Sequence, residues 1–178
     1  MGRMSESTPG AEGPVRTLVV TVSDRAAGGS REDRSGPRLV DLLSAAGYAV
    51  DGPVLVTDGV QPVRRALEDA VAEGYRMVVT TGGTGVSPRD YTPEATRALV
   101  TRELHGVAEH LRREGARHTP LAALSRGVVG VVDVPGPDRL GVLLVNLPGS
   151  LKAVEQSVVA LLPLLPHVLD QIVGWDHR

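Results

Sequence analysis

The sequence predicts an α/β protein: a three-layer α/β/α sandwich with a mainly parallel sheet and an antiparallel edge hairpin. Between residues 16 and 80, short runs of β-branched and aliphatic residues alternate with segments in which apolar residues recur at helical spacing. That alternation is typical of βαβ units and therefore of parallel strands. Two later apolar runs, at residues 128–134 and 142–146, flank a Pro- and Gly-bearing turn at 135–138, which indicates a hairpin.

Three strands and two helices are predicted in the first half of the chain. The strands are short, continuous apolar runs, at residues 16–22, 54–56 and 77–80. The first helix, residues 35–46, has Ser35 as its expected N-cap and Gly47 just after its end. The second helix, residues 62–72, is stopped by Gly74.

The second half begins with a glycine-rich turn directly after the third strand. Thr92 is the expected N-cap of a helical stretch, which runs to about residue 117 and is interrupted near residues 104–106. After the hairpin, Ser150 is expected to cap a last helix, which is broken or restarted by two prolines, Pro163 and Pro166.

Length and composition indicate one domain. The chain of 178 residues fits a single domain over residues 16–174, a size that needs no disulfide or metal to stabilise it. Residues 1–15 are expected to be a disordered leader without the apolar core of a signal peptide, and 175–178 a short tail. The most apolar late stretch, residues 158–165, is too short to cross a membrane and contains Pro163.

Charge and residue usage exclude several classes of function. Lys and Arg number 19 against 21 Asp and Glu, unlike a domain that binds nucleic acid by broad phosphate neutralisation. Because there is no cysteine, thiolate zinc sites, iron–sulfur clusters and cysteine nucleophiles are ruled out. Three Tyr, one Trp and no Phe leave few aromatic faces for stacking bases. We therefore expect neither a nucleic acid nor a membrane as partner.

Three polar loops follow directly on strands, at residues 23–24, 81–85 and 146–150. In a parallel sheet the carboxyl ends of the strands meet at one edge, and ligands bind beyond that edge. We therefore expect these loops to lie together and to form the site.

The glycine-rich turn is the strongest candidate. Its glycines allow backbone amides to approach an oxyanion and its threonines add hydroxyls, in the run Thr81, Gly82, Gly83, Thr84 and Gly85. Arg89 offers a fork for phosphate, and Asp90 beside it is a candidate Mg²⁺ ligand. The alternative is a turn needed only to leave the strand. The turn is not a Walker A loop, because the only lysine is Lys152, and it does not match GxGxxG.

Other polar residues near strand ends are candidates that also have simpler interpretations. Asp58, paired with Asp90, would bind Mg²⁺ on a triphosphate, whereas alone it is typical of an Asp-Gly turn, and Asp24 has the same ambiguity. Ser35 and Gly36 lie at a helix N-terminus, which is a cap first and an anion site second.

Two further segments offer contacts to phosphate. Ser150 and Lys152 lie where the last strand meets the last helix, either as ligands of a phosphate or as an ordinary cap and a solvated lysine. Ser125 and Arg126, before the hairpin, place a hydroxyl beside a guanidinium.

Taken together, these segments resemble the molybdopterin adenylyltransferase family of molybdenum cofactor biosynthesis, the Mog/MoaB-like group. The resemblance covers about residues 16–174. The matching stretches are residues 22–24, 33–37, 58, 81–85, 88–95, 124–126 and 147–150. Leu151 departs from the family's loop, which has a second proline there, and Tyr91 stands where valine is common.

The resemblance implies Mg²⁺- and ATP-dependent adenylylation of molybdopterin, giving adenylyl-molybdopterin and pyrophosphate. It also implies a cytoplasmic homotrimer, with a molybdenum-insertion protein as a further partner. Asp58 and Asp90 would be catalytic and hold Mg²⁺. The resemblance also implies that phosphates contact Gly82, Gly83 and Thr84. The nucleotide would contact Ser23, Asp24, Pro148 and Gly149. The pterin or its phosphate would contact Ser125 and Arg126.

Three alternatives stand beside the enzyme. A non-catalytic molybdopterin-binding or carrier protein of the same fold would bind without releasing pyrophosphate. A multidomain molybdenum-insertion protein is disfavoured by the length of 178 residues. An unrelated phosphate-binding α/β protein would explain the glycine-rich turn but not the other matching segments.

Overall fold

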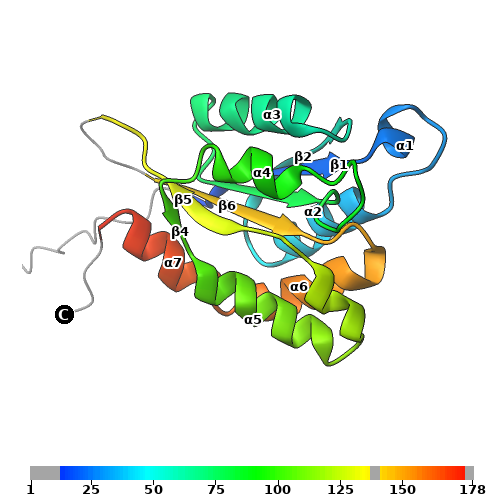
Figure 1. Cartoon of the computed structure of the whole chain (residues 1–178). Coiled ribbons are helices and arrows are strands. Elements are labelled where there is room, and N and C mark those ends of the chain that lie inside the picture. Colours follow the sequence, from blue (N-terminus) through cyan, green and yellow to red (C-terminus); the bar gives the residue numbers. More distant parts are fainter. Residues whose placement is uncertain (1–12, 137–140, 175–178) are drawn as a thin grey trace, which may run out of the picture.

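The computed structural model describes residues 13–136 and 141–174 and has three layers, with a six-stranded sheet between two layers of helices (Figure 1). The strand order is β2-β1-β3-β6-β5-β4. The strands, in chain order, are β1 Arg16–Val22, β2 Ala49–Val56, β3 Met77–Thr81, β4 Arg102–Glu103, β5 Val129–Val132 and β6 Val142–Leu147. The predicted fold class is confirmed.

The sheet is parallel over four strands and antiparallel at one side. β2, β1, β3 and β6 run parallel, and β6 pairs antiparallel with β5 as the predicted hairpin requires. The hairpin is not itself the edge, because β4 pairs antiparallel with β5 and lies outside it. Part of the predicted turn, residues 137–138, lies outside the described residues, as do residues 1–12 of the leader and the tail at 175–178. The predicted domain boundaries stay a prediction.

Four helices cover one face of the sheet, shown below it in Figure 1. They bury aliphatic side chains such as Leu39, Leu43 and Leu165 against the inward residues of the central strands. Because the chain has no phenylalanine, this core is built of Val, Leu, Ile, Met and Ala. The helices are α2 Ser35–Ala45, α5 His105–Ala116, α6 Leu151–Leu161 and α7 Leu165–Ile172.

The opposite face carries a smaller core under α3 (Val60–Ala72) and α4 (Thr92–Arg97), which Figure 1 shows above the sheet. Two short helices complete the structure: α1 (Asp24–Ala27) follows β1, and the 3₁₀ helix η1 (Pro120–Leu124) precedes β5. Within residues 13–136 and 141–174 no single helix is long and apolar enough to cross a membrane. The one pair that passes together, α6 and α7, is bent by 64°.

Several predicted details were wrong. β2 begins at Ala49, five residues before the predicted strand, because Asp51, Gly52 and Pro53 interrupt the apolar run. The interruption predicted near residues 104–106 exists, but it begins earlier, after Arg97, and it contains the unpredicted strand β4. Ser35 lies inside α2 rather than capping it, and Asp33 Oδ1 accepts from the amides of Ser35 and Gly36 at 3.1 and 3.0 Å instead. The Thr92 hydroxyl does not cap α4 either.

Candidate functional site

The loops after the parallel strands are linked to one another at a single edge of the sheet. The amide of Ser23, after β1, donates to the carbonyl oxygen of Val56 at the end of β2, at 2.9 Å. The hydroxyl of Thr81, at the end of β3, donates to the carbonyl oxygen of Pro148, after β6, at 2.8 Å. Residues of all three loops, 23–24, 81–85 and 146–150, also line one cavity, so their expected gathering is confirmed.

The glycine-rich turn has a conformation that side chains rarely adopt. Gly82 and Gly83 have φ angles of 100° and 63°. A Cβ on Gly82 would lie 2.3 Å from the carbonyl oxygen of Val22, and one on Gly83 would lie 2.3 Å from Thr92 Oγ1. The Thr92 hydroxyl donates to the carbonyl oxygen of Gly82 at 3.0 Å. The turn is thus packed tightly between β1 and α4, and the Thr92 hydroxyl secures it.

Two cavities open on either side of this turn. The polar cavity, of about 320 Å³, lies between the turn, α1 and the start of α2. The apolar cavity, of about 450 Å³, lies between the turn, α5, η1 and α6. Both are lined by the same four residues, Gly82, Gly83, Asp90 and Gly149. The glycine-rich turn and Asp90 therefore form the wall between two chambers.

Two aspartates brace the polar cavity by binding each other's backbone. The amide of Asp24 donates to Asp58 Oδ2 at 3.0 Å, and the amide of Asp58 donates to Asp24 Oδ1 at 3.0 Å. These reciprocal bonds join the loops after β1 and β2. Among the described residues, Asp58 Oδ1 has no hydrogen-bond partner. One oxygen of Asp58 therefore holds the loop while the other is available to a ligand.

Asp90 is held in a similar way at the wall of both cavities. Its Oδ2 accepts from the amide of Ser87 at 2.9 Å, which leaves Oδ1 without a protein partner in the described part of the chain. Arg89 lines the polar cavity, and its Nη1 lies 3.5 Å from Asp24 Oδ2. Residues 13–136 and 141–174 contain no group of three His, Asp or Glu placed to hold a metal ion. A cation bound by Asp58 and Asp90 therefore needs further oxygens from a ligand, which is how proteins usually hold Mg²⁺.

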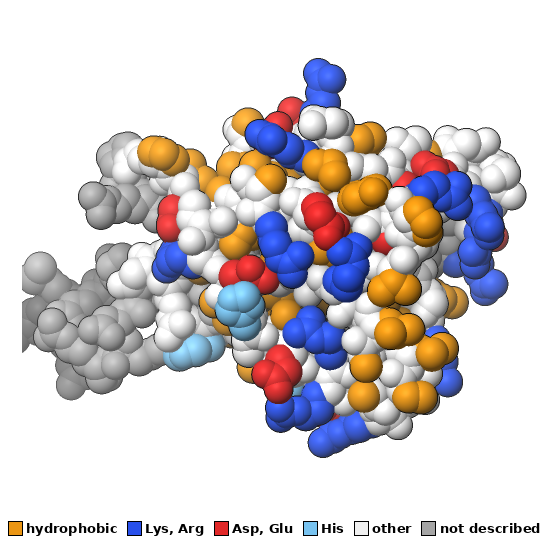
Figure 2. All heavy atoms as spheres, viewed as in Figure 1, with side chains coloured by type: hydrophobic (Ala, Val, Ile, Leu, Met, Phe, Trp, Pro, Cys, Tyr) orange, Lys and Arg blue, Asp and Glu red, His pale blue; other side chains and the backbone are white. Residues whose placement is uncertain are grey.

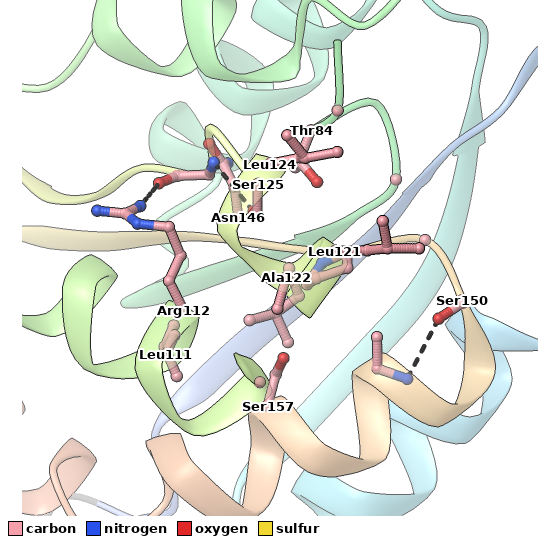
Figure 3. Close-up of a pocket in the computed structure, with 18 of the residues that line it drawn as sticks. Thr84, Leu111, Arg112, Leu121, Ala122, Leu124, Ser125, Asn146, Ser150 and Ser157 are labelled. Carbon is pink, nitrogen blue, oxygen red and sulfur yellow. Dashed lines mark hydrogen bonds between the residues drawn. The ribbon is translucent and has the colours of Figure 1, made fainter. Parts of the chain in front are cut away.

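The apolar cavity has a polar floor and aliphatic walls (Figure 3). Asn146 of β6 lies at the floor, where its amide nitrogen donates to Thr80 and Thr96 hydroxyls at 3.0 and 2.9 Å. Arg112 of α5 donates to the carbonyl oxygen of Gly127 at 3.3 Å. The walls come from α5, η1 and α6 and include Leu111, Leu121, Ala122, Leu124 and Ala153. Such a chamber suits a planar organic ring with a few hydrogen-bonding edges.

Arg126 fastens the segment that carries Asp90. Its backbone amide donates to the carbonyl oxygen of Thr84 at 2.8 Å, and its Nε donates to the carbonyl oxygen of Gly85 at 2.7 Å. Its two terminal nitrogens contact the carbonyl oxygen of Asp90 and the carboxylate of Glu94. Burial, the largest single influence, raises the pKa of Glu94, but the hydrogen bond and charge of Arg126, a backbone hydrogen bond and the charge of Arg97 together hold the net pKa below its usual range.

A family model described as "Probable molybdopterin binding domain" matches residues 18–167. The chain belongs to this family. It is 34% identical over 161 residues to a molybdopterin adenylyltransferase of Helicobacter pylori, covering 88% of this chain and 86% of the relative. The solved structure of MoaB from Thermus thermophilus is 41% identical, with a TM-score of 0.80 and coverage of 92% and 99% of the two chains.

Other members of the molybdopterin-binding family are longer. A molybdenum cofactor biosynthesis bifunctional protein of Synechococcus elongatus is 37% identical over 168 residues, which cover 94% of this chain and 50% of the relative. The chain thus spans about half the length of that curated relative, and about a quarter of the Drosophila melanogaster protein cinnamon.

The structure brings most of the predicted site residues to the two cavities. The polar cavity is lined by Ser23, Asp24, Ser35, Asp58, Thr81 and Arg89. The apolar cavity is lined by Thr84, Gly85, Ser125, Pro148 and Ser150. Ser150 also caps α6, as predicted, because its Oγ accepts from the amide of Ala153 at 3.2 Å.

Three predicted residues of this molybdopterin-binding domain line neither cavity. Lys152 is exposed on α6. Arg126 lies behind the glycine-rich turn and contacts its backbone. Gly36 is buried, and a Cβ there would lie 2.2 Å from Thr21 Oγ1 and 2.4 Å from Asp33 Oδ2. Arg126 and Gly36 therefore support the walls of the site without lining a cavity.

Sequence reasoning missed the residues that enter the cavities from helices. Arg112, Gln156 and Ser157 line the apolar cavity from α5 and α6. Their signal in the sequence is weak, because polar residues on a helix normally indicate a solvated face. The arginines at positions 25, 31 and 34 line the polar cavity and were also missed, although three arginines within ten residues, shortly after a strand end, are a visible signal.

Proposed function

We propose that the chain adenylylates molybdopterin, using Mg²⁺ and ATP and releasing pyrophosphate. The single observation that carries the proposal is the pair of cavities that share the glycine-rich turn and Asp90. A two-substrate transfer needs two chambers that meet at the reacting atoms. The relatives named molybdopterin adenylyltransferase, which match over most of their length, support the same reaction.

The residues that line each cavity indicate which substrate it binds. The polar cavity, with Ser23, Asp24 and Asp58, receives the phosphates of ATP. The apolar cavity, with Ser125 on its rim, receives the pterin ring. The terminal phosphate of molybdopterin then reaches the turn from one side and the α-phosphate of ATP from the other. The amide of Gly83, which has no protein acceptor among the described residues, is the backbone donor placed to neutralise developing charge, whereas the Gly82 amide donates to the carbonyl oxygen of Leu147 at 3.1 Å.

The proposed reaction does not require the protein to transfer a proton. A phosphate oxygen of molybdopterin attacks the α-phosphorus of ATP, and a new P–O bond forms. The bond from the α-phosphorus to the bridging oxygen breaks, and pyrophosphate leaves with the electron pair. Because a phosphate monoester is already an anion at pH 7, no strong base is required. The protein aligns two anions and screens their repulsion.

Asp58 and Asp90 hold the Mg²⁺ that accompanies ATP in this proposal. Both residues line the polar cavity, and each has one carboxylate oxygen bound to a backbone amide, of Asp24 and Ser87 respectively, and one without a protein partner among the described residues. The remaining ligands would have to be phosphate oxygens and water, which Mg²⁺ commonly keeps in proteins. When bound, the ion neutralises charge on the phosphates of ATP.

The setting of the reaction is also a proposal. We infer a cytoplasmic homotrimer that passes its product to a molybdenum-insertion protein. The bifunctional relatives, of which this chain matches half, support a close link between this domain and a second activity.

The test is pyrophosphate release from molybdopterin and Mg-ATP. We expect wild type to release pyrophosphate, and Asp90→Asn to be slower by about a hundredfold or more, since the neutral amide is a weaker ligand than a carboxylate for the proposed Mg²⁺. Asp41→Asn, an exposed aspartate on α2, is the matched control and should retain wild-type turnover. Equal rates for Asp90→Asn and wild type would refute the site. Binding of molybdopterin with no release by wild type would favour the carrier protein.

A further inference from the structure

Four arginines line the polar cavity: Arg25, Arg31, Arg34 and Arg89. Figure 2 shows basic side chains gathered at the end of the molecule where α1 lies. Only Arg89 among the four has a carboxylate partner in the described residues, which is Asp24 at 3.5 Å. Elsewhere on the surface, arginines such as Arg64 and Arg113 are paired with a glutamate one turn away. Within the part of the chain that the structure describes, the cavity therefore has three guanidinium groups without protein anions.

The loop that carries these arginines is fixed by its own backbone. The carbonyl oxygen of Arg25 accepts from the amides of Ser30 and Arg31, at 2.9 and 3.1 Å, and from the Ser30 hydroxyl at 3.2 Å. Three donors on one carbonyl bring Arg31 back against the end of α1. On the other side, Asp33 Oδ1 holds the start of α2 and so fixes the segment next to Arg34. The arginines are thus attached to an ordered frame.

The charges that line the polar cavity define what it can hold. Besides the four arginines, its walls carry five carboxylates, from Asp24, Glu32, Asp33, Asp58 and Asp90. A highly charged anion alone meets a wall with no net positive charge. An anion that is complexed with a divalent cation fits this wall better. The carboxylates contact the cation, and the guanidinium groups contact the oxygens of the anion. Arginine binds phosphate oxygens in a bidentate fork, which a chain of two phosphates can occupy repeatedly.

We propose that Arg25, Arg31 and Arg34 form a clamp for Mg²⁺-complexed diphosphate: the β- and γ-phosphates of ATP before transfer, and pyrophosphate after it. The clamp rests on the proposed function for its place in the reaction. As the bond between the α-phosphorus and the bridging oxygen breaks, the leaving pyrophosphate gains the electron pair and one unit of negative charge. The clamp accepts that charge and holds the product until it dissociates.

Binding of inorganic pyrophosphate to the whole chain tests the clamp directly. We would titrate wild type, Arg31→Gln/Arg34→Gln and Arg113→Gln/Arg117→Gln with pyrophosphate and with AMP, each with and without Mg²⁺, by calorimetry. The control pair lies at the C-terminal end of α5, lines neither cavity and removes the same net charge. It therefore cancels any effect of overall charge on binding.

The clamp predicts three results. Wild type binds pyrophosphate more tightly with Mg²⁺ than without it. The Arg31→Gln/Arg34→Gln variant binds Mg-pyrophosphate at least about tenfold more weakly, because two charge-assisted contacts are lost. Its affinity for AMP, which has no β- or γ-phosphate, stays within about twofold of wild type, and the control variant matches wild type throughout.

The outcomes separate the clamp from the proposed function. Equal Mg-pyrophosphate affinity in the double variant and wild type, or no Mg-pyrophosphate binding by wild type, would overturn the clamp even if turnover persists. Loss of Mg-pyrophosphate binding in the double variant supports the clamp. If wild type then failed to turn over molybdopterin, the proposed adenylylation would be overturned and the clamp would stand. A parallel loss of AMP binding would show general damage to the cavity and overturn the assignment to the β- and γ-phosphates.

Discussion

Replacing Arg126 with lysine should slow the reaction more than it destabilises the fold. The guanidinium contacts three acceptors at once, on Gly85, Asp90 and Glu94, whereas a lysine ammonium is a single point on a flexible stem. Two lost hydrogen bonds at about 1 kcal/mol each give about 2 kcal/mol. Because Arg126 and Glu94 are about a third exposed, solvent reduces the loss to about 1–2 kcal/mol.

The effect on turnover is larger because Arg126 holds the backbone of Asp90. A displacement of about 1 Å at a reacting group costs up to about a hundredfold in rate, so we expect kcat to fall tenfold to a hundredfold with a smaller change in KM. Urea denaturation and pyrophosphate release measure the two effects on the same protein. Wild-type kcat in Arg126→Lys, with a folded protein, would refute the positioning role.

The pH dependence of stability gives an independent check on the same pair. The pKa of Glu94 is lowered in the folded state, although burial opposes the effect of Arg126. A lowered carboxyl pKa stabilises the fold above the unfolded pKa and loses that stabilisation as the pH falls through the folded value. The stability difference between wild type and Glu94→Gln should therefore be constant near neutral pH and shrink below the ordinary glutamate pKa of about 4.3. A difference that grows in acid would contradict this account.

Two further predictions concern the turn and the last strand–helix junction. Gly82→Ala should unfold at a much lower urea concentration than wild type, since Gly82 has a φ of 100° and a Cβ there would lie 2.3 Å from the carbonyl oxygen of Val22. The control Gly106→Ala, which has open space around the new Cβ, should be at least as stable as wild type. Ser150→Ala should lower the free energy of unfolding by about 1 kcal/mol through loss of the α6 cap, and Ser150→Asp should retain it; equal melting temperatures for Ser150→Ala and wild type would contradict the cap.

The order of strands and helices could be predicted because each buried strand is a continuous apolar run. β1, β3 and β6 are buried along nearly their whole length, so their boundaries were found within one residue. β2 was shortened because it is an edge strand with no fully buried residue and contains Gly52 and Pro53. β4 was missed because two residues, Arg102 and Glu103, carry no periodicity at all. Its pairing with β5 exists only in the tertiary structure.

The site was predictable where function coincides with a change in backbone direction. Glycines and an aspartate shortly after strands identified the turn and Asp58, since parallel strands bring their ends together. Asp90 was identified by its place beside Arg89 in the loop that continues the turn. The roles of Arg126 and Gly36 were not predictable, because each acts on atoms far away in sequence: Arg126 on Gly85 and Asp90, and Gly36 on the side chain of Thr21. The type of a residue indicates which chemical groups its side chain can bind. It does not indicate which of those groups the tertiary structure places beside it.

The two chambers explain why the wall between them is built of backbone. Two polyanions must approach within bonding distance, and any side chain between them would hold them apart. Gly82 and Gly83 let the backbone itself form the wall, packed so closely that a Cβ on Gly82 would collide with Val22 and one on Gly83 with Thr92. The tightly packed turn is also secured by hydrogen bonds, from the Thr92 hydroxyl to the carbonyl oxygen of Gly82 and from Arg126 to the carbonyl oxygen of Gly85. The unusual number of contacts made by Arg126 is thus the structural counterpart of the glycines, and neither feature serves the reaction without the other.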